Sequence, residues 1–359
     1  MIKTYQHYLI KLFYKKILIT SLIFFCLIII LNIFEEINFF KNLEVNFFFP
    51  FWLSLLKTPA NLFEVFPFIF LISTQFFFLE LIDKNELEVF KVNGLNNIKI
   101  LKIISLISVI LGILIIIIFY QFSSKLKFIY FDLKNNHAKD DKYLAVVTEN
   151  GLWIKDEINK KKYIINAEKI ENNFLRNVSI AEFDQNFDLI QIIESFNVDI
   201  SNFNWIISKP IISKDNSTNN LKQDLIIQTH FDQNKINSMF RNLSSLNILQ
   251  LNKLREDYKS LGYSAFDVTS HLNKLYSFPI YLSIMSIFSA IIMLNIKRNK
   301  PMIFHIVFGI LLSVVIYYFY YLFNLLGQNG KIPLLVSVWL PLFMLMIFIT
   351  IGLIRVNEK

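Results

Sequence analysis

Long uncharged apolar stretches are the feature that most limits what this chain can fold into. An α-helix rises 1.5 Å per residue, so roughly 20 apolar residues cross the ~30 Å hydrocarbon core of a bilayer. Six stretches of about this length occur, at residues 17–34, 62–82, 103–122, 275–296, 303–326 and 332–354. We therefore predict an α-helical membrane protein with six transmembrane helices, three before and three after a long polar insert.

The composition agrees with a membrane protein and excludes several kinds of site. Of the 359 residues, 54% are hydrophobic and only 18% are charged, which is too apolar for an ordinary soluble protein of this size. The single cysteine, Cys26, lies inside the first apolar stretch, so neither a disulfide nor a cysteine-based metal site is expected. The five histidines are scattered, and we expect no metal and no cofactor. No small-residue cleavage site follows the first stretch, so it is predicted to be a retained helix rather than a signal peptide.

The second stretch is the weakest of the six, because Glu64, Pro67 and Gln75 interrupt it. Residues 47–56 just before it are apolar but number only ten, so we interpret them as an interfacial or re-entrant piece. A seven-span arrangement is the alternative that this run leaves open.

The distribution of Lys and Arg near the span ends predicts the orientation, because cytoplasmic loops carry an excess of these residues. If the N-terminus lies inside, the outer loops carry only Lys41, Lys57 and Lys331. Thirteen basic residues then lie on the cytoplasmic side: Lys3, Lys11, Lys15, Lys16, Lys84, Lys91, Lys99, Lys102, Lys297, Arg298, Lys300, Arg355 and Lys359. Both termini are therefore predicted to be cytoplasmic, and the long insert to lie outside.

The polar insert shows the alternating pattern of half-buried β-strands. Short period-2 runs separated by Asn, Asp, Gly or Lys occur at residues 143–148, 151–155, 163–166, 178–183, 187–194, 203–208 and 224–229. Many short strands without intervening helices favour an all-β jelly roll or sandwich, which we assign to residues 123–240. After it, an amphipathic helical connector is expected over residues 241–274, with Ser244 or Ser245 as a helix cap and Gly262 as a stop. The flanking transmembrane halves are residues 1–122 and 275–359.

Motifs of nucleotide-hydrolysing and hydrolytic enzymes do not occur in this sequence. It contains no GxxxxGK[ST], GxGxxG, HExxH or GxSxG pattern, and only eight glycines are available for phosphate-binding loops. We therefore expect a protein that is not an enzyme and that hydrolyses no nucleotide itself. A membrane enzyme would need a convergent polar site in the spans, where the sequence offers little beyond Glu64.

The charged segment of residues 80–102 lies between the second and third spans on the predicted cytoplasmic side. Its first half has helical spacing and ends at Gly94, a typical helix C-terminal stop. One interpretation is a solvated connector. The other is a short coupling helix that docks on a cytoplasmic partner, with Glu86 and Glu88 as carboxylates and Leu87, Val89 and Phe90 as an apolar face.

Two further groups of polar residues lie near the outer ends of the spans. Glu35, Glu36 and Lys41 follow the first span; they are either interfacial anchors or the mouth of a cavity for an amphipathic substrate. Glu64 in the second span is less usual, because an ionisable group at apolar depth tends to face a bundle interior or a cavity. The helix that enters the fourth span carries a polar stripe of Asp267, His271 and Lys274. This stripe is either the water-facing side of an interfacial helix or a binding site for a charged headgroup.

The order and spacing of several motifs resemble the lipopolysaccharide export permeases LptF and LptG (the YjgP/YjgQ family), over essentially the whole chain. These motifs are YLIKLFYKKIL (8–18), TPANLFEVFPFIFLIS (58–73), KNELEVFKVNG (84–94), ENGLWIKD (149–156), HLNKLYSFP (271–279) and GKIPLLVSVWLP (330–341). Two segments, GLWIKD in the fourth motif and Gly-x-Ile-Pro in the last, look more like LptG than LptF.

This resemblance implies a permease subunit of an ABC transporter in the bacterial inner membrane, with a periplasmic β-jellyroll domain. Its partners would be a cytoplasmic ATPase dimer, a paralogous six-span permease, lipopolysaccharide and a periplasmic β-jellyroll bridge protein, with no nucleic acid. Glu86 matches the family's coupling-helix glutamate. Where LptG-like sequences have a lysine for lipid phosphates, this chain has Asn32, and Lys41 would substitute only if the geometry allows it. The alternative function is a membrane-anchored envelope adaptor whose β domain binds another envelope protein.

Overall fold

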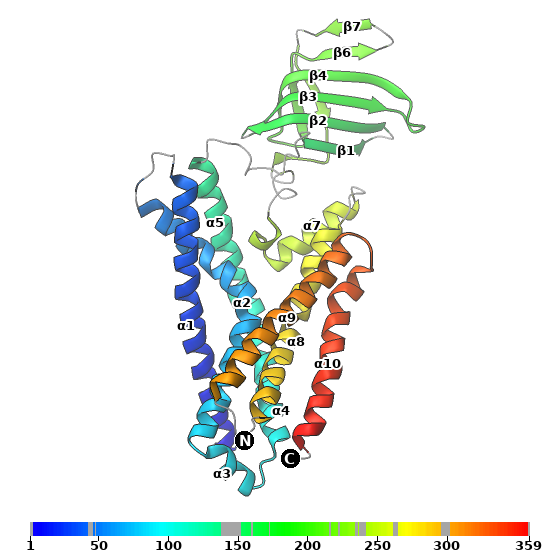
Figure 1. The fold of residues 1–359 in the computed structure, drawn as a ribbon. Coiled ribbons are helices and arrows are strands. Elements are labelled where there is room, and N and C mark those ends of the chain that lie inside the picture. The colour runs from blue at the N-terminus through cyan, green and yellow to red at the C-terminus, as the bar shows by residue number, and fades with distance from the viewer. Residues whose placement is uncertain are drawn as a thin grey trace. The chain divides into compact units, whose positions relative to one another are not determined.

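The structure is a computed structural model of the chain. It describes residues 3–41, 46, 48–137, 152–158, 161–171, 173–214, 217–221, 223–233, 236, 242–260, 265–295 and 302–357. The chain divides into two compact units (Figure 1). A helical unit contains Met1–Tyr130, Ser244–Asn252 and Ala265–Lys359, and a β unit contains Phe131–Leu243 and Lys253–Ser264.

Within the described residues, six helical segments are long and apolar enough to cross a membrane. They are formed by α1 (Thr4–Phe40), α2 (Phe48–Asp83), the run of α4 (Asn97–Leu114), η1 (Ile115–Tyr120) and α5 (Gln121–His137), then α8 (Phe266–Leu294), α9 (Met302–Gln328) and α10 (Leu334–Asn357). The short α3 (Glu86–Val92) joins α2 to α4. The six-span prediction is confirmed, and each helical segment is longer than the apolar stretch from which it was predicted.

Two expectations about the first half differ from the structure. Residues 48–56 are not a separate re-entrant piece but the first turns of α2, which continues through Pro59 and Pro67. The Ser54 and Thr58 hydroxyls donate to carbonyl oxygens one turn earlier, at 2.7 Å each, as polar side chains commonly do in membrane helices. The third helical run also passes the predicted boundary at residue 122 and continues to His137, and the first described strand begins only at Leu152.

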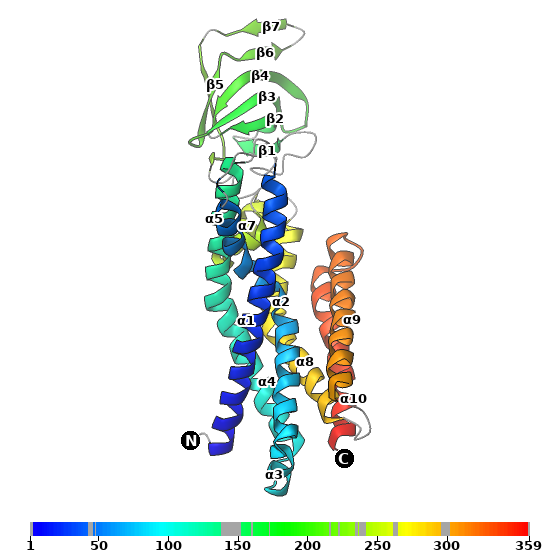
Figure 2. The ribbon, with the colours of Figure 1, turned by 60° about the vertical axis from the view of Figure 1, so that its left-hand side comes forward.

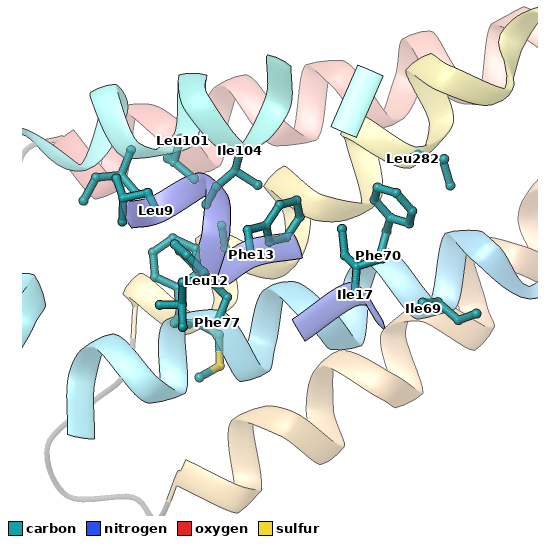
Figure 3. Packing of buried hydrophobic residues seen from close by; sticks show 14 of the residues in the cluster. Leu9, Leu12, Phe13, Ile17, Ile69, Phe70, Phe77, Leu101, Ile104 and Leu282 are labelled. Atoms are coloured by element: carbon teal, nitrogen blue, oxygen red, sulfur yellow. The ribbon is translucent and has the colours of Figure 1, made fainter. Parts of the chain in front are cut away.

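The first half of the helical unit is held together by aromatic packing between α1 and α2. Phe13 of α1 contacts Phe70 and Phe77 of α2 edge to face, with ring centroids 6.4 and 5.7 Å apart (Figure 3). Leu101 and Ile104 of α4 belong to the same buried cluster. Because lipid tails are as apolar as these side chains, close packing rather than exclusion of water stabilises this cluster.

Small residues bring α4 and α8 close together. Two pairs of serine hydroxyls hydrogen-bond between these helices, Ser105 with Ser283 at 2.8 Å and Ser108 with Ser286 at 2.9 Å. A Cβ at Gly112 would lie 2.7 Å from the Cα of Pro279. This contact permits only glycine at position 112, as is common where membrane helices approach closely.

The ends of the helices show which elements share a side of the helical unit. The first residues of α1, the last residues of α10 and the whole of α3 lie at one end (Figures 1 and 2). This arrangement follows from an even number of spans, since each crossing reverses the chain direction.

The described part of the β unit contains eight strand segments in one curled antiparallel sheet. They are β1 (Leu152–Ile158), β2 (Lys161–Glu171), β3 (Phe174–Phe183), β4 (Leu189–Asp199), β5 (Asn204–Ser208), β6 (Ile211–Lys214), β7 (Ser217–Asn220) and β8 (Leu225–Gln228). The strands β1 to β5 pair in chain order, whereas β8 pairs with β5 and the hairpin of β6 and β7 pairs with β4 through β6. The inserted all-β domain is thus confirmed, whereas the predicted strand at 143–148 lies outside the described residues.

β5 and β6 are consecutive segments that lie along the same side of β4. Both pair with β4 in the same register, Val198 with Ile207 and Ile193 with Ile212. The ladder is interrupted at Lys209, whose φ is 45°, and at Pro210, which has no N–H to donate. The inner face of the sheet is filled by a core around Trp205, whose indole N–H donates to the Phe231 carbonyl at 2.7 Å.

The connector after the sheet begins differently from the prediction. Leu243–Ser245 form a 3₁₀ turn, and α7 spans Ile248–Ser260. Asn247 caps it instead of Ser244 or Ser245, because its carbonyl Oδ1 accepts from the Gln250 N–H while the Gln250 side chain accepts from the Asn247 N–H. Residues 266–274 are the first turns of α8 rather than part of a separate connector. Gly262, the predicted stop, lies outside the described residues.

Candidate functional site

The first candidate site is α3, whose ends are defined by two residues in the left-handed region of φ. Asn85 precedes the helix with φ 57°, and Glu86 and Glu88 stand in its first turn, where the helix dipole favours carboxylates. At the other end Gly94 has φ 79°. Its N–H donates to the Lys91 carbonyl and the next N–H, of Leu95, donates to the Phe90 carbonyl, both at 3.0 Å. This pair of bonds is a Schellman motif, which needs glycine for its φ.

Glu86 is attached to the first transmembrane helix. The Tyr8 hydroxyl of α1 donates to Glu86 Oε2 at 2.6 Å, and the Tyr8 ring lies against that of Phe90, with centroids 6.4 Å apart. Glu86 and Phe90 therefore link α3 to α1 through Tyr8.

The two faces of α3 differ from the sequence interpretation. Leu87 is buried against the helical unit, and Phe90 packs against the same core. Val89 and Val92 point away and are 57% and 88% exposed, and Glu88 is exposed beside them. The prediction that Leu87, Val89 and Phe90 share one apolar face is thus wrong. Val89 lies on the outward face together with Val92, whereas Leu87 and Phe90 face the helical unit.

Ion pairs anchor the segment that leads into α3. Glu80 of α2 contacts Lys16 of α1 at 2.5 Å and Lys84 at 2.6 Å. The hydrogen bond from Lys84 to the Glu80 carboxylate raises the pKa of the Lys84 ammonium above its ordinary value. Because the pKa is raised, the contribution of this ion pair to stability is present at neutral pH. It is lost only when the pH rises through the elevated pKa.

The second candidate site lies at the C-terminal end of α1, where Asn32 is buried between α1 and α2. Its Nδ2 donates to the Thr58 hydroxyl at 3.0 Å and its Oδ1 accepts from Asn61 Nδ2 at 2.9 Å. Only 3% of its surface is exposed. Both ends of the amide are therefore engaged within the helix pair, and Asn32 acts as a packing residue here.

Glu36 is likewise buried, next to the ion pair of Glu35 and Lys57. Glu36 is 0% exposed and accepts from the Tyr130 hydroxyl at 2.7 Å. Lys57 Nζ lies 2.6 Å from Glu35 Oε1 and 3.9 Å from Glu36 Oε1, and it also lies over the Tyr130 ring. We call these residues, with Asn32, Thr58 and Asn61, the α1–α2 polar cluster.

Sequence reasoning did not single out Lys57 as a site residue. The available signal was a lysine between two apolar segments, residues 51–56 before it and the second predicted span after it. Lys41 stands just past the last residue of α1 and is exposed. Of the predicted lipid-path residues at this end, Glu35 and Lys41 reach the surface, whereas Asn32 and Glu36 do not.

The third candidate site is a pocket of about 330 Å³ that Glu64 shares with residues of α8 and α9. Lys274 and His271 line it as well, so two members of the predicted polar stripe meet Glu64, whereas Asp267 does not line the pocket. His271 Nε2 lies 3.0 Å from the Tyr120 hydroxyl, which also contacts the Leu246 carbonyl. Tyr281 and Asn324 are among the other polar residues of the wall. We call this cavity the Glu64 pocket.

Neither Glu64 nor Lys274 makes an ion pair with any residue that the structure describes. The described part of the chain also contains no group of three His, Cys, Asp or Glu side chains that could hold a metal ion. The Glu64 pocket therefore offers charged side chains to a ligand, whereas those of the α1–α2 polar cluster bind one another.

Comparison with known proteins identifies the family. A search of curated proteins gave no match. The family model described as "Lipopolysaccharide export system permease LptF/LptG" matches residues 7–355, nearly the whole chain, without separating LptF from LptG. With six apolar helices and an inserted β domain, the chain is a multi-pass inner-membrane protein and belongs to the LptF/LptG family of lipopolysaccharide export permeases.

Proposed function

We propose that this chain is one permease subunit of an ABC transporter that extracts lipopolysaccharide from the inner membrane and passes it to a periplasmic bridge protein. The match over residues 7–355 is the observation that carries this proposal. A separate cytoplasmic ATPase dimer would supply the energy, and a paralogous six-span permease would complete the transport path. The distribution of Lys and Arg supports an orientation with both termini and α3 in the cytoplasm and the β unit in the periplasm.

In this proposal α3 couples the ATPase to the transmembrane helices. Its exposed Val89 and Val92 offer an apolar contact, and Glu88 stands exposed in the acidic first turn. Glu86 transfers movement to α1 through the hydroxyl of Tyr8. The Schellman motif at Gly94 keeps the short helix at a defined angle to the start of α4.

The proposed lipid path passes the exposed residues Glu35, Lys41 and Glu64, whereas the buried Asn32 and Glu36 hold the path's wall in place. Lys41, which is exposed just past the last residue of α1, supplies the positive charge there for a lipid phosphate, because Lys57 is paired with Glu35. In the β unit, Ile206 and Ile226 are cross-strand neighbours that are 40% and 65% exposed, and they offer apolar surface to acyl chains on the way to the bridge protein.

The coupling role is tested with Glu86→Ala in proteoliposomes that contain the assembled transporter. We expect the variant to insert and assemble normally, while lipopolysaccharide release per ATP hydrolysed falls about tenfold or more, because a charge-assisted hydrogen bond to α1 is lost. Tyr8→Phe removes only the hydroxyl and should give a smaller defect in the same direction. Glu157→Gln, an exposed carboxylate in β1, is the matched control.

Normal release by Glu86→Ala would contradict the coupling role of α3. If the purified chain brings neither an ATPase nor a second six-span permease with it, even after cross-linking at position 86, the transporter proposal itself fails and the envelope-adaptor function takes its place.

A further inference from the structure

The Glu64 pocket contains polar atoms that the protein leaves without partners. Tyr281 is 5% exposed and Asn324 is 3% exposed, and both line the pocket. Among the described residues, the Tyr281 hydroxyl and the Asn324 carbonyl Oδ1 have no hydrogen-bond partner. Unpaired polar groups at this depth cost free energy, so a native structure normally satisfies them with water or a ligand.

The charged side chains of the pocket have both signs and do not pair with each other. Glu64 presents a carboxylate and Lys274 an ammonium group, and neither makes an ion pair with a described residue. A ligand with a single negative charge would satisfy Lys274 but would be repelled by Glu64. A ligand with both charges satisfies the two side chains together.

The remaining wall fits the same kind of ligand. Phe63 stacks on Phe278 with ring centroids 4.5 Å apart, and Tyr281 stacks on Tyr320 at 4.9 Å, so aromatic faces surround the polar groups. Aromatic faces attract organic ammonium groups. Apolar residues between membrane helices also accept the glycerol and the first methylene groups of a lipid.

We propose that the Glu64 pocket binds a zwitterionic phosphoethanolamine headgroup of a membrane phospholipid. Glu64 and Asn324 Oδ1 accept from the ligand's ammonium group, while Lys274 and the Tyr281 hydroxyl donate to its phosphate. The pocket's volume of about 330 Å³ leaves room for the headgroup and the start of its glycerol. This site lies within one permease chain, between α2, α8 and α9, and its occupation does not depend on lipid export.

The test measures lipid bound to the purified full-length chain in detergent by native mass spectrometry, without ATPase and without nucleotide. Phosphatidylethanolamine, phosphatidylglycerol, phosphatidylcholine and lipid A that carries no phosphoethanolamine are added separately. We expect one tightly held phosphatidylethanolamine per chain. Phosphatidylglycerol, which lacks the ammonium group, should bind about tenfold more weakly, as expected when one charged hydrogen-bond partner is missing.

Matched variants identify the pocket as the site. Glu64→Gln and Lys274→Gln should each weaken phosphatidylethanolamine binding about tenfold, and Tyr281→Phe should weaken it by a smaller factor. Glu157→Gln in the β unit should leave it unchanged. Glu64→Gln should also reduce the preference for phosphatidylethanolamine over phosphatidylglycerol, which a mere loss of folding would not do.

Three results would overturn the proposal. They are equal binding of phosphatidylglycerol and phosphatidylethanolamine, unchanged binding in the Glu64→Gln variant, and preferential binding of the lipid A lacking phosphoethanolamine. The last result would show that the pocket holds the exported lipid rather than a phospholipid headgroup. Because the measurement uses no ATPase, failure of the export proposal would not alter any of these outcomes.

Discussion

Two groups of ionisable residues lie in the helical unit, and they use their charges in opposite ways. In the α1–α2 polar cluster, Glu36 accepts from Tyr130 and Lys57 pairs with Glu35, so the polar atoms are engaged inside the protein. In the Glu64 pocket, Glu64 and Lys274 make no ion pair with a described residue. Both groups look alike in the sequence, as charges next to apolar runs. The difference teaches that a charge in a membrane helix indicates a ligand only where the fold leaves it unpaired.

The largest effect is expected from Lys57→Met, which removes the ammonium group that lies 3.9 Å from the buried Glu36 Oε1. Removing one partner of a buried ion pair typically costs about 3 kcal/mol, because the remaining charge stays buried with less compensation. We expect the free energy of unfolding to fall by about that amount, as measured by denaturant titration in detergent.

A double-mutant cycle separates lost pairing from lost packing at Lys57. Glu36→Gln in the Lys57→Met background should restore part of the stability, since the buried charge is then gone. If the changes in the free energy of unfolding are simply additive, Lys57 and Glu36 are not coupled. The charges of the α1–α2 polar cluster would then not be paired in the way that distinguishes them from those of the Glu64 pocket.

A smaller effect is expected from Asn32→Leu. The substitution removes the two hydrogen bonds that the Asn32 amide makes with Thr58 and Asn61. Hydrogen bonds between membrane helices are worth about 0.6 kcal/mol each, so a loss of about 1 kcal/mol in the free energy of unfolding is expected. Lipopolysaccharide release should remain within about twofold of the unmodified chain, because Asn32 is buried; a complete loss of release with normal stability would show that lipid does reach it.

The smallest effect on stability is expected from Glu64→Gln. Glu64 is exposed to the pocket and pairs with no described residue, so the free energy of unfolding should change by no more than about 0.5 kcal/mol in delipidated detergent. Added phosphatidylethanolamine should raise the melting temperature of the unmodified chain more than that of the variant, because a ligand stabilises the state that binds it. A large loss of stability without lipid would mean that Glu64 is a structural residue like Glu36.

Predictions from the sequence succeeded where a single physical requirement acts on a continuous segment. A run of about 20 apolar residues has few alternatives to a spanning helix, so the six spans follow directly from the chain. Alternation likewise located strands at 187–194 and 203–208, which appear as parts of β4 and β5. The short β6 and β7 were missed, because Lys209 and Pro210 interrupt the chain between β5 and β6 and no alternating run remains.

The sequence by itself determined the number of spans, the position of the β insert and the position of α3. The first two depend on the local pattern of hydrophobic residues, and the end of α3 depends on Gly94. Only the tertiary structure decided which polar residues are paired. The partners Asn32 and Thr58, or Tyr130 and Glu36, are separated by 26 and 94 residues, and no local pattern brings them together. Whether Glu36 or Glu64 is open to a ligand therefore depends on how the helices pack, because packing alone determines which side chains lie within hydrogen-bonding distance.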